Sequence, residues 1–246
     1  MTGSFSAQAA SNNQFNLVGD TWKLVTLVTA DKTVYGPSGQ IFYTIRLTAE
    51  GKVELTADCN IGGGTYTLVG DKLTLSPMAT TMMGCSEGSI GSQFARMLTG
   101  DHTVSWDGGN LVLTSADGTV ITLKPALVDV VWLWNGPADA NGTPVAIDPA
   151  KYTISFTSDG KLALGADCNR GISTYLTNDG GIAIRGIGLT RAMCAEGSLS
   201  NQFVAALETA TAYRIAGGQL TLTTAAGDMV FAAQPQNTGI AATPVN

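Results

Sequence analysis

The sequence predicts an α+β fold that is mainly antiparallel β, built as two tandem copies of a small curved sheet packed on one short helix. Three observations predict this fold. A shift of 109 residues places Cys59 on Cys168 and Cys85 on Cys194, so the chain contains one domain twice. Apolar and polar residues alternate along most of each copy, which is typical of half-buried strands. One segment in each copy has the spacing of an amphipathic helix instead.

The repeat divides the chain into four parts. Its register holds without a gap from Gly51 to Gly118, and each copy has the length of an ordinary domain. We expect a flexible leader over 1–16, a first domain over 17–125, a second domain over 126–234 and a flexible tail over 235–246. Because almost no linker separates the copies, we expect a monomer whose two domains pack closely. A residue present in only one copy cannot carry an activity that both copies share.

Alternation predicts the strands in order. Each copy opens with a tryptophan strand, at Trp22 and at Trp132, and these and Trp134 are expected in the core, with the domain interface as the alternative for Trp134. The strands that follow in the first copy cover 43–48, 53–57, 73–75, 111–115 and 119–123. Gly51 turns the first of these hairpins, and glycine suits such a turn because it accepts a positive φ. The second copy repeats the same alternation.

Helical spacing interrupts the strands once per copy. In the first copy Ile90, Phe94 and Leu98 share one face, and the second copy repeats this face. Ser89 and Ser198 precede the two segments and are expected to be their N-caps. We expect the apolar face of each helix to cover the concave side of its sheet.

Composition and charge limit the partners. The net charge is −6, and the thirteen Lys and Arg residues form no cluster, so nucleic acid and anionic membranes are unfavourable partners. No apolar run reaches the length of a transmembrane helix. The beginning of the sequence has neither a basic segment nor an apolar one, as expected for a cytosolic protein or for a chain that follows a removed signal peptide.

The four cysteines indicate the compartment. They allow three connectivities, and the duplication favours Cys59 with Cys85 and Cys168 with Cys194, because each copy must fold with what it carries. Buried free thiols are the alternative. A zinc site is less favoured because the close C-x-x-C spacing of structural zinc sites is absent. Disulfides would place the protein in the periplasm, on the outer-membrane surface or outside the cell, whereas free thiols would place it in the cytoplasm.

These residues together resemble the META domain, the family of the bacterial heat-shock protein HslJ. The shared pattern is a tryptophan strand, a Cys-Asn turn, a tyrosine, a Thr-x-x-x-Cys segment, a helix with a phenylalanine and a closing L-x-L strand. The matching residues are Trp22, Asp58-Cys59-Asn60, Tyr66, Thr81, Cys85, Phe94 and Leu111-Val112-Leu113, then Trp132, Asp167-Cys168-Asn169-Arg170, Tyr175, Thr190, Cys194, Phe203 and Leu220-Thr221-Leu222.

The resemblance covers about nine-tenths of the chain. It implies a small sheet-and-helix domain of envelope lipoproteins or secreted bacterial proteins, with roles in stress tolerance, antibiotic resistance or secretion, and it supplies no catalytic residues. The sequence departs from the family at Asp58 and Asp167, where glycine is usual. It also has Ile61 where the second copy keeps the usual Arg170.

No catalytic, cofactor-binding or metal-binding residue is predicted. His102 is the one histidine, the repeat places Thr211 opposite it, and its neighbour Asp101 indicates a solvated surface position. A serine nucleophile would have to use this same histidine, and a cysteine nucleophile needs an activating base that neither copy supplies. The Gly62-Gly63-Gly64 run lacks the Lys-Ser/Thr of a phosphate loop and is expected to be a flexible turn.

Acidic residues flank the cysteines in both copies. The pairs Asp58/Glu87 and Asp167/Glu196 could perturb each other's pKa, bind a cation such as Ca²⁺ or act in glycoside hydrolysis. The favoured interpretation is structural, with each aspartate in a turn and each glutamate complementing a helix dipole. The candidate interaction surface is Asp58, Asn60, Glu87, Asp167, Asn169, Arg170 and Glu196.

Methionines form a further run beside the first cysteine pair. Met78, Met82 and Met83 could contact a partner, but the second copy offers only Met193, which favours core filling or loop packing.

The sequence therefore favours a non-enzymatic envelope or secreted protein that binds an unidentified protein or a small apolar ligand. The alternatives are an inhibitor of a secreted hydrolase, such as a protease or lysozyme, and a weak cation-binding or hydrolytic protein that uses the two acidic pairs.

Overall fold

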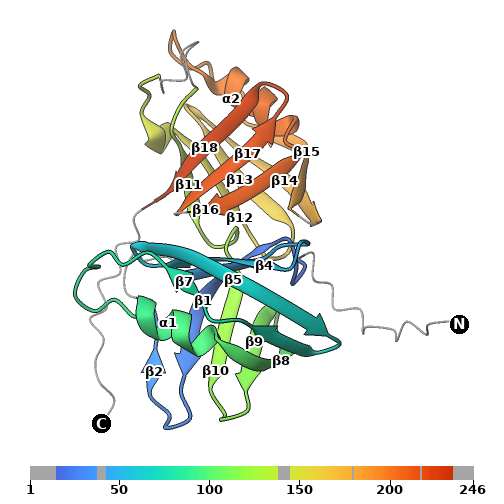
Figure 1. Ribbon diagram of the computed structural model, residues 1–246. Coiled ribbons are helices and arrows are strands. Elements are labelled where there is room, and N and C mark those ends of the chain that lie inside the picture. Colours follow the sequence, from blue (N-terminus) through green and yellow to red (C-terminus); the bar gives the residue numbers. More distant parts are fainter. Residues whose placement is uncertain (1–14, 38–42, 138–144, 179, 217, 235–246) are drawn as a thin grey trace, which may run out of the picture.

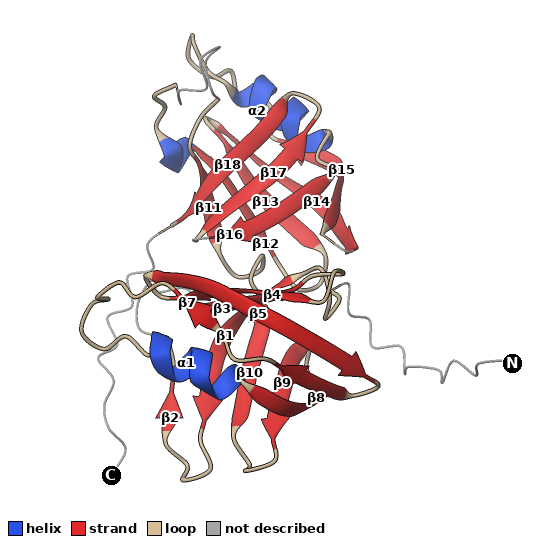
Figure 2. Cartoon of the chain, in the orientation of Figure 1, coloured by secondary structure: helices blue, strands red, loops and turns tan. Residues whose placement is uncertain are grey.

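The computed structural model describes residues 15–37, 43–137, 145–178, 180–216 and 218–234, and it contains two β-barrels stacked on each other (Figures 1 and 2). Every ladder within the two barrels is antiparallel. The predicted tandem, mainly antiparallel β architecture is therefore confirmed. The expected flexible tail over 235–246 and most of the expected leader lie outside the described residues.

The first domain closes into a barrel because its first and last long strands pair. Its strands are β1 (Thr21–Val28), β2 (Val34–Tyr35), β3 (Tyr43–Leu47), β4 (Lys52–Ala57), β5 (Asn60–Val69), β6 (Lys72–Leu75), β7 (Ala79–Thr80), β8 (Gly100–Asp107), β9 (Asn110–Ser115) and β10 (Val120–Pro125). The order runs β10-β9-β8-β6-β5-β4-β3-β1, and β1 then pairs with β10. The short strands β2 and β7 are side branches on β1 and β5.

The second domain is a closed barrel in consecutive strand order. Its strands are β11 (Val131–Trp134), β12 (Tyr152–Phe156), β13 (Lys161–Ala166), β14 (Asn169–Asn178), β15 (Gly181–Leu189), β16 (Ala212–Ala216), β17 (Gln219–Thr224) and β18 (Gly227–Ala233), with the 3₁₀ turn η1 (Pro149–Lys151) before β12. In both domains the expected curved sheet is thus closed into a barrel. Closure pairs each long strand on both sides, and apolar and polar residues alternate in the same way in an open sheet and in a barrel.

Each domain contains one α-helix at the segment where helical spacing was predicted to interrupt the strands. These are α1 (Gly91–Leu98) and α2 (Ser200–Glu208), and α2 lies across one end of the second barrel (Figure 1). Phe94 and Phe203 are fully buried in the corresponding positions. The expected N-caps are shifted by one residue, to Ile90 and Leu199. Ser89 still contributes, because its hydroxyl accepts a hydrogen bond from the amide of Gly91 at 3.3 Å.

The three predicted core tryptophans are buried. Trp22 and Trp132 have no exposed surface, and Trp134 is 3% exposed. Trp134 packs against Tyr152 and Phe203 inside the second barrel, so it is a core residue and not an interface residue.

The Gly62-Gly63-Gly64 run lies inside strand β5, so the prediction of a flexible turn is wrong. The short strand β7 approaches β5 too closely for side chains. A Cβ atom on Gly62 would lie 2.0 Å from the carbonyl oxygen of Ala79. Glycine is needed here for close backbone approach and not for a turn.

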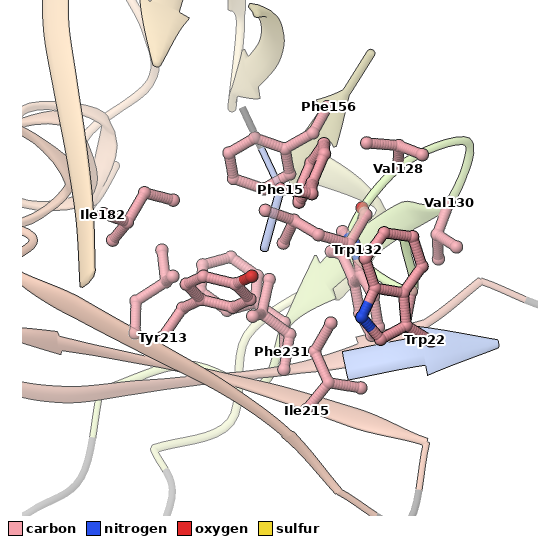
Figure 3. Close-up of a cluster of buried hydrophobic side chains, with 14 of the residues drawn as sticks. Phe15, Trp22, Val128, Val130, Trp132, Phe156, Ile182, Tyr213, Ile215 and Phe231 are labelled. Atoms are coloured by element: carbon pink, nitrogen blue, oxygen red, sulfur yellow. The ribbon is translucent and has the colours of Figure 1, made fainter. Parts of the chain in front are cut away.

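The segment before β1 joins the two domains. Phe15, at the end of the expected leader, is 5% exposed and belongs to one buried cluster with Trp22 and with Phe156 and Tyr213 of the second barrel (Figure 3). The side chain of Asn16 donates a hydrogen bond to Asn178 of the second domain. The expected close packing of the domains is therefore present. No helix within the described ranges is long and apolar enough to cross a membrane.

Candidate functional site

Each domain has one disulfide, and both have the predicted within-copy pairing. Cys59 bonds to Cys85 and Cys168 bonds to Cys194, with Cα–Cα distances of 5.5 and 5.4 Å. No cysteine of the four is free, which removes the free-thiol and zinc alternatives. The two bridges favour an oxidising compartment.

Asn60 organises the chain around the first bridge. Its Oδ1 accepts hydrogen bonds from the amide of Met83 at 2.7 Å and from the hydroxyl of Thr81 at 2.9 Å. Its Nδ2 donates to the carbonyl of Met83 at 3.1 Å and to Sγ of Cys85 at 3.2 Å. Asn60 was predicted to be part of an interaction surface, but its side-chain amide is hydrogen-bonded to the disulfide loop, residues 81–89.

Asn169 makes the same contacts in the second domain. Its Oδ1 accepts from the amide of Ala192 and the hydroxyl of Thr190, each at 2.9 Å. Its Nδ2 donates to the carbonyl of Ala192 at 3.1 Å and to Sγ of Cys194 at 3.3 Å. Because both copies use the asparagine identically, its shared role is structural.

The aspartates before the cysteines are turn residues. Asp58 and Asp167 have φ values of 64° and 57°, in the left-handed region that aspartate tolerates better than most residues. Asp167 Oδ1 lies 3.2 Å from Nζ of Lys151. A hydrogen bond from Ser198 and the Lys151 contact lower the pKa of Asp167. Both partners stabilise the ionised carboxylate, and no second carboxylate among the described residues contributes to this shift.

The remaining candidate residues lie on the surface. Glu87 and Glu196 are exposed, and neither helix has an acidic residue in its first turn. The proposed helix-dipole role of the glutamates is therefore wrong, because the helices begin four residues later. Arg170 folds back and donates to the carbonyls of Asp167 and Asn169, each at 3.0 Å. Within the described ranges, no group of three or more His, Cys, Asp or Glu residues could hold a metal ion.

His102 is buried, so the prediction of a solvated surface position is wrong. It is 2% exposed, and its Nε2 and Nδ1 lie 2.9 Å from the carbonyl of Leu98 and 3.1 Å from the hydroxyl of Ser115. Burial lowers its pKa. These contacts tie the end of α1 to β9. The inward position follows from the period of two in β8, which the neighbouring Asp101 obscured.

Both disulfide loops, residues 81–89 and 190–198, present methionine to solvent. Met82 is 98% exposed and Met83 61%, so core filling is wrong for these two residues, and Met193 is 99% exposed in the second copy. Only Met78 packs partly against the core. An exposed apolar side chain on a cross-linked loop is the feature of this region that sequence reasoning weighed too lightly.

Two antiparallel barrels, each with one helix and one disulfide, define a tandem-repeat, disulfide-stabilised β protein. The family model of the META domain matches residues 15–128 and 130–237. The chain therefore belongs to the META domain family, and it contains the domain twice. The family resemblance read from the sequence is confirmed.

No curated protein matches the chain. Among solved structures, a protein from Burkholderia xenovorans determined by NMR is similar, with 21% identity and a TM-score of 0.39, covering 51% of this chain and 99% of its own. A DUF4847 family protein from Bacteroides vulgatus is similar at 18% identity and a TM-score of 0.34, covering 46% of this chain and 97% of its own. Each corresponds in length to about half of this chain.

Proposed function

We propose that the protein is a non-enzymatic binding module of the bacterial envelope or of the secreted proteins, with the stress-related role that its family resemblance implies. The observation that carries this proposal is that the asparagines shared by both copies have a structural role. Asn60 and Asn169 lie at the centre of the two matching sites. Their side chains make hydrogen bonds to the disulfide loop of their own domain. The disulfides support the oxidising compartment.

The proposed contact surface consists of the two disulfide loops. Each loop is cross-linked through its central cysteine, Cys85 or Cys194, and carries a nearly fully exposed methionine, Met82 or Met193. A flexible thioether adapts to different apolar partners, while a fixed loop loses little conformational freedom on binding.

Affinity capture from periplasmic extract and culture medium tests this proposal. The full chain is compared with the triple variant Met82→Ser, Met83→Ser, Met193→Ser. The matched control is Val69→Ser with Leu176→Ser, which removes exposed apolar side chains outside the loops. We expect the wild type and the control to retain a partner that the triple variant loses. Equal capture by all three proteins contradicts the proposed surface.

Inhibition of a secreted hydrolase is the second candidate. It is favoured by the same exposed, cross-linked loops, because an inhibitor needs a rigid segment that projects into an active-site cleft. Its test is the identity and activity of the captured partner. A protease or lysozyme that loses turnover with one equivalent of this protein supports inhibition, and a partner without hydrolase activity contradicts it.

A further inference from the structure

A cleft of about 820 Å³ lies where the two domains meet. One wall is the outer face of the first barrel, formed by β3, β4, β5 and β7. The other wall is the end of β16 and the start of β17 in the second barrel, which faces the first domain (Figure 1). A volume of this size accommodates a small organic molecule.

The floor of the cleft consists of threonines that point away from the core of the first barrel. Thr21, Thr44 and Thr56 alternate with core residues, yet they are only 5%, 5% and 8% exposed. Ile61, Ala79 and Ala216 add apolar surface around them, and Ile61 is 58% exposed. The lining is therefore mainly apolar, with hydroxyl groups at intervals.

Three charged side chains meet in this cleft. Glu54 accepts from Arg46 of its own barrel and from Arg214 of the second barrel, each at 3.4 Å. Arg46 is also fixed by a 2.7 Å hydrogen bond from its Nε to the carbonyl of Gly19. Arg214 is 61% exposed, and Glu54 is the one polar contact of its guanidinium among the described residues. Two cations and one anion leave a local charge of +1 in a chain whose net charge is −6.

This charged group belongs to the junction and not to the repeated domain. The repeat places Ser155 and Ala163 opposite Arg46 and Glu54, and it places Ser105 opposite Arg214. Neither domain alone contains both walls of the cleft. The site therefore exists because two copies are joined in this arrangement.

We propose that this interdomain cleft binds a small monocarboxylate with an apolar body, with its carboxylate on the guanidinium of Arg214. The exposed donors of Arg214 suit a carboxylate, which a guanidinium binds through two parallel hydrogen bonds. The local charge of +1 matches a monoanion better than a phosphate ester, which carries nearly two negative charges. The apolar lining accepts the rest of the molecule. This inference deepens the proposed binding function by adding a ligand site that adjoins the first disulfide loop at Thr81 and whose lining contains none of the exposed methionines.

Calorimetric titration of the full chain with matched acid and neutral probes tests the site. The probes are octanoate against octanol, and N-acetyl-Ala-Ala-Leu acid against its amide, so that the two arms distinguish a fatty acid from a peptide terminus. For the acid of the preferred arm we expect about a tenfold lower Kd than for its neutral partner, because the charge-assisted contact is lost in the neutral probe.

Three variants locate the binding. Arg214→Gln should remove the preference for the acid, whereas Arg185→Gln, which removes an exposed arginine outside the cleft, should keep it. Ala216→Trp should fill the cleft and weaken the acid and the neutral probe alike. The proposal is overturned if the wild type binds none of the probes or binds acid and neutral probes equally. It is also overturned if Arg185→Gln loses the preference for the acid as Arg214→Gln does. Affinity capture through the disulfide loops is measured separately, so the cleft proposal and the proposed contact surface can fail independently.

Discussion

The hydroxyl of Tyr213 donates a 2.5 Å hydrogen bond to Oδ1 of Asp20, across 193 positions of the chain and from one domain to the other. Asp20 has no exposed surface. Its Oδ2 accepts from the amide of Asn16, so the carboxylate also fixes the segment that carries Phe15 into the domain junction. Burial and the neighbouring Asp20 raise the pKa of Tyr213 well above its ordinary value, which keeps the hydroxyl protonated as a donor.

Replacing Tyr213 by Phe should loosen the junction. The change leaves Oδ1 of a buried carboxylate without this donor, and a hydrogen bond to a charged group contributes about 1.5–3 kcal/mol. We expect the free energy of unfolding in urea to fall by that amount. The control, Tyr66→Phe, removes a bond to the carbonyl of Thr48 within one domain and should cost about 1 kcal/mol. Equal losses of unfolding free energy in the two variants would show that the contact between Tyr213 and Asp20 stabilises the protein no more than a hydrogen bond within one domain.

Removing one disulfide should destabilise its own domain. Each bridge closes a segment with a sequence separation of 26 residues, so the chain-entropy model gives about 3.5 kcal/mol for Cys59→Ala with Cys85→Ala. The pair Cys168→Ala with Cys194→Ala should cost a similar amount. Guanidinium unfolding of each variant measures both. Thiol titration of the denatured wild type should find no free thiol, and four thiols would contradict the bridges.

Acid should destabilise the first domain through His102. Burial lowers its pKa below the ordinary 6.5, so the unfolded chain binds more protons than the folded chain in the interval between the two values. The stability contribution is complete above about pH 6.5 and is lost as the pH falls through this interval. His102→Thr, with the residue that the second copy has, should flatten the dependence of Tm on pH between 7.5 and 5. An unchanged slope would assign the acid sensitivity to other groups.

Substituting Gly62 by Ala should disturb the pairing of β5 with β7. The new Cβ meets backbone atoms of Ala79 and Thr80, which cannot rotate away as a side chain can, so we expect a loss of about 1–3 kcal/mol. Gly84→Ala is the matched control in the adjacent loop, because no atom lies within 4 Å of its Cβ position. The control should stay within about 0.5 kcal/mol of the wild type in thermal unfolding. Equal effects would contradict the close approach of the two strands.

Local patterns predicted the repeated elements well. Alternation located β1, β3, β4, β6, β9, β10 and their counterparts in the second copy, but it gave no range for β5, β8, β14 or β16. Helical spacing located α1 and α2, and the duplication favoured Cys59–Cys85 and Cys168–Cys194 among the three possible connectivities. Each of these features depends on residues within one copy, and the second copy provides an independent repeat of the evidence.

Several positions were misjudged because their neighbours in space are not their neighbours in sequence. Gly62 is a strand residue because β7 packs against it, and His102 is buried although Asp101 beside it is exposed. Met82 and Met83 are exposed on the loop that contains Cys85, and Met193 is exposed on the loop that contains Cys194.

By itself, the sequence determined a duplicated META domain with one helix and one cysteine pair per copy, since periodicity and repetition are local properties that survive in the linear chain. Only the tertiary structure decided that each sheet closes into a barrel and that the copies meet through Asp20, Tyr213, Glu54 and Arg214. These junction residues occur in one copy each and lie far apart in the chain, so no spacing pattern relates them. Their contacts arise from how two folded surfaces fit together, which is settled after each domain has buried its own core.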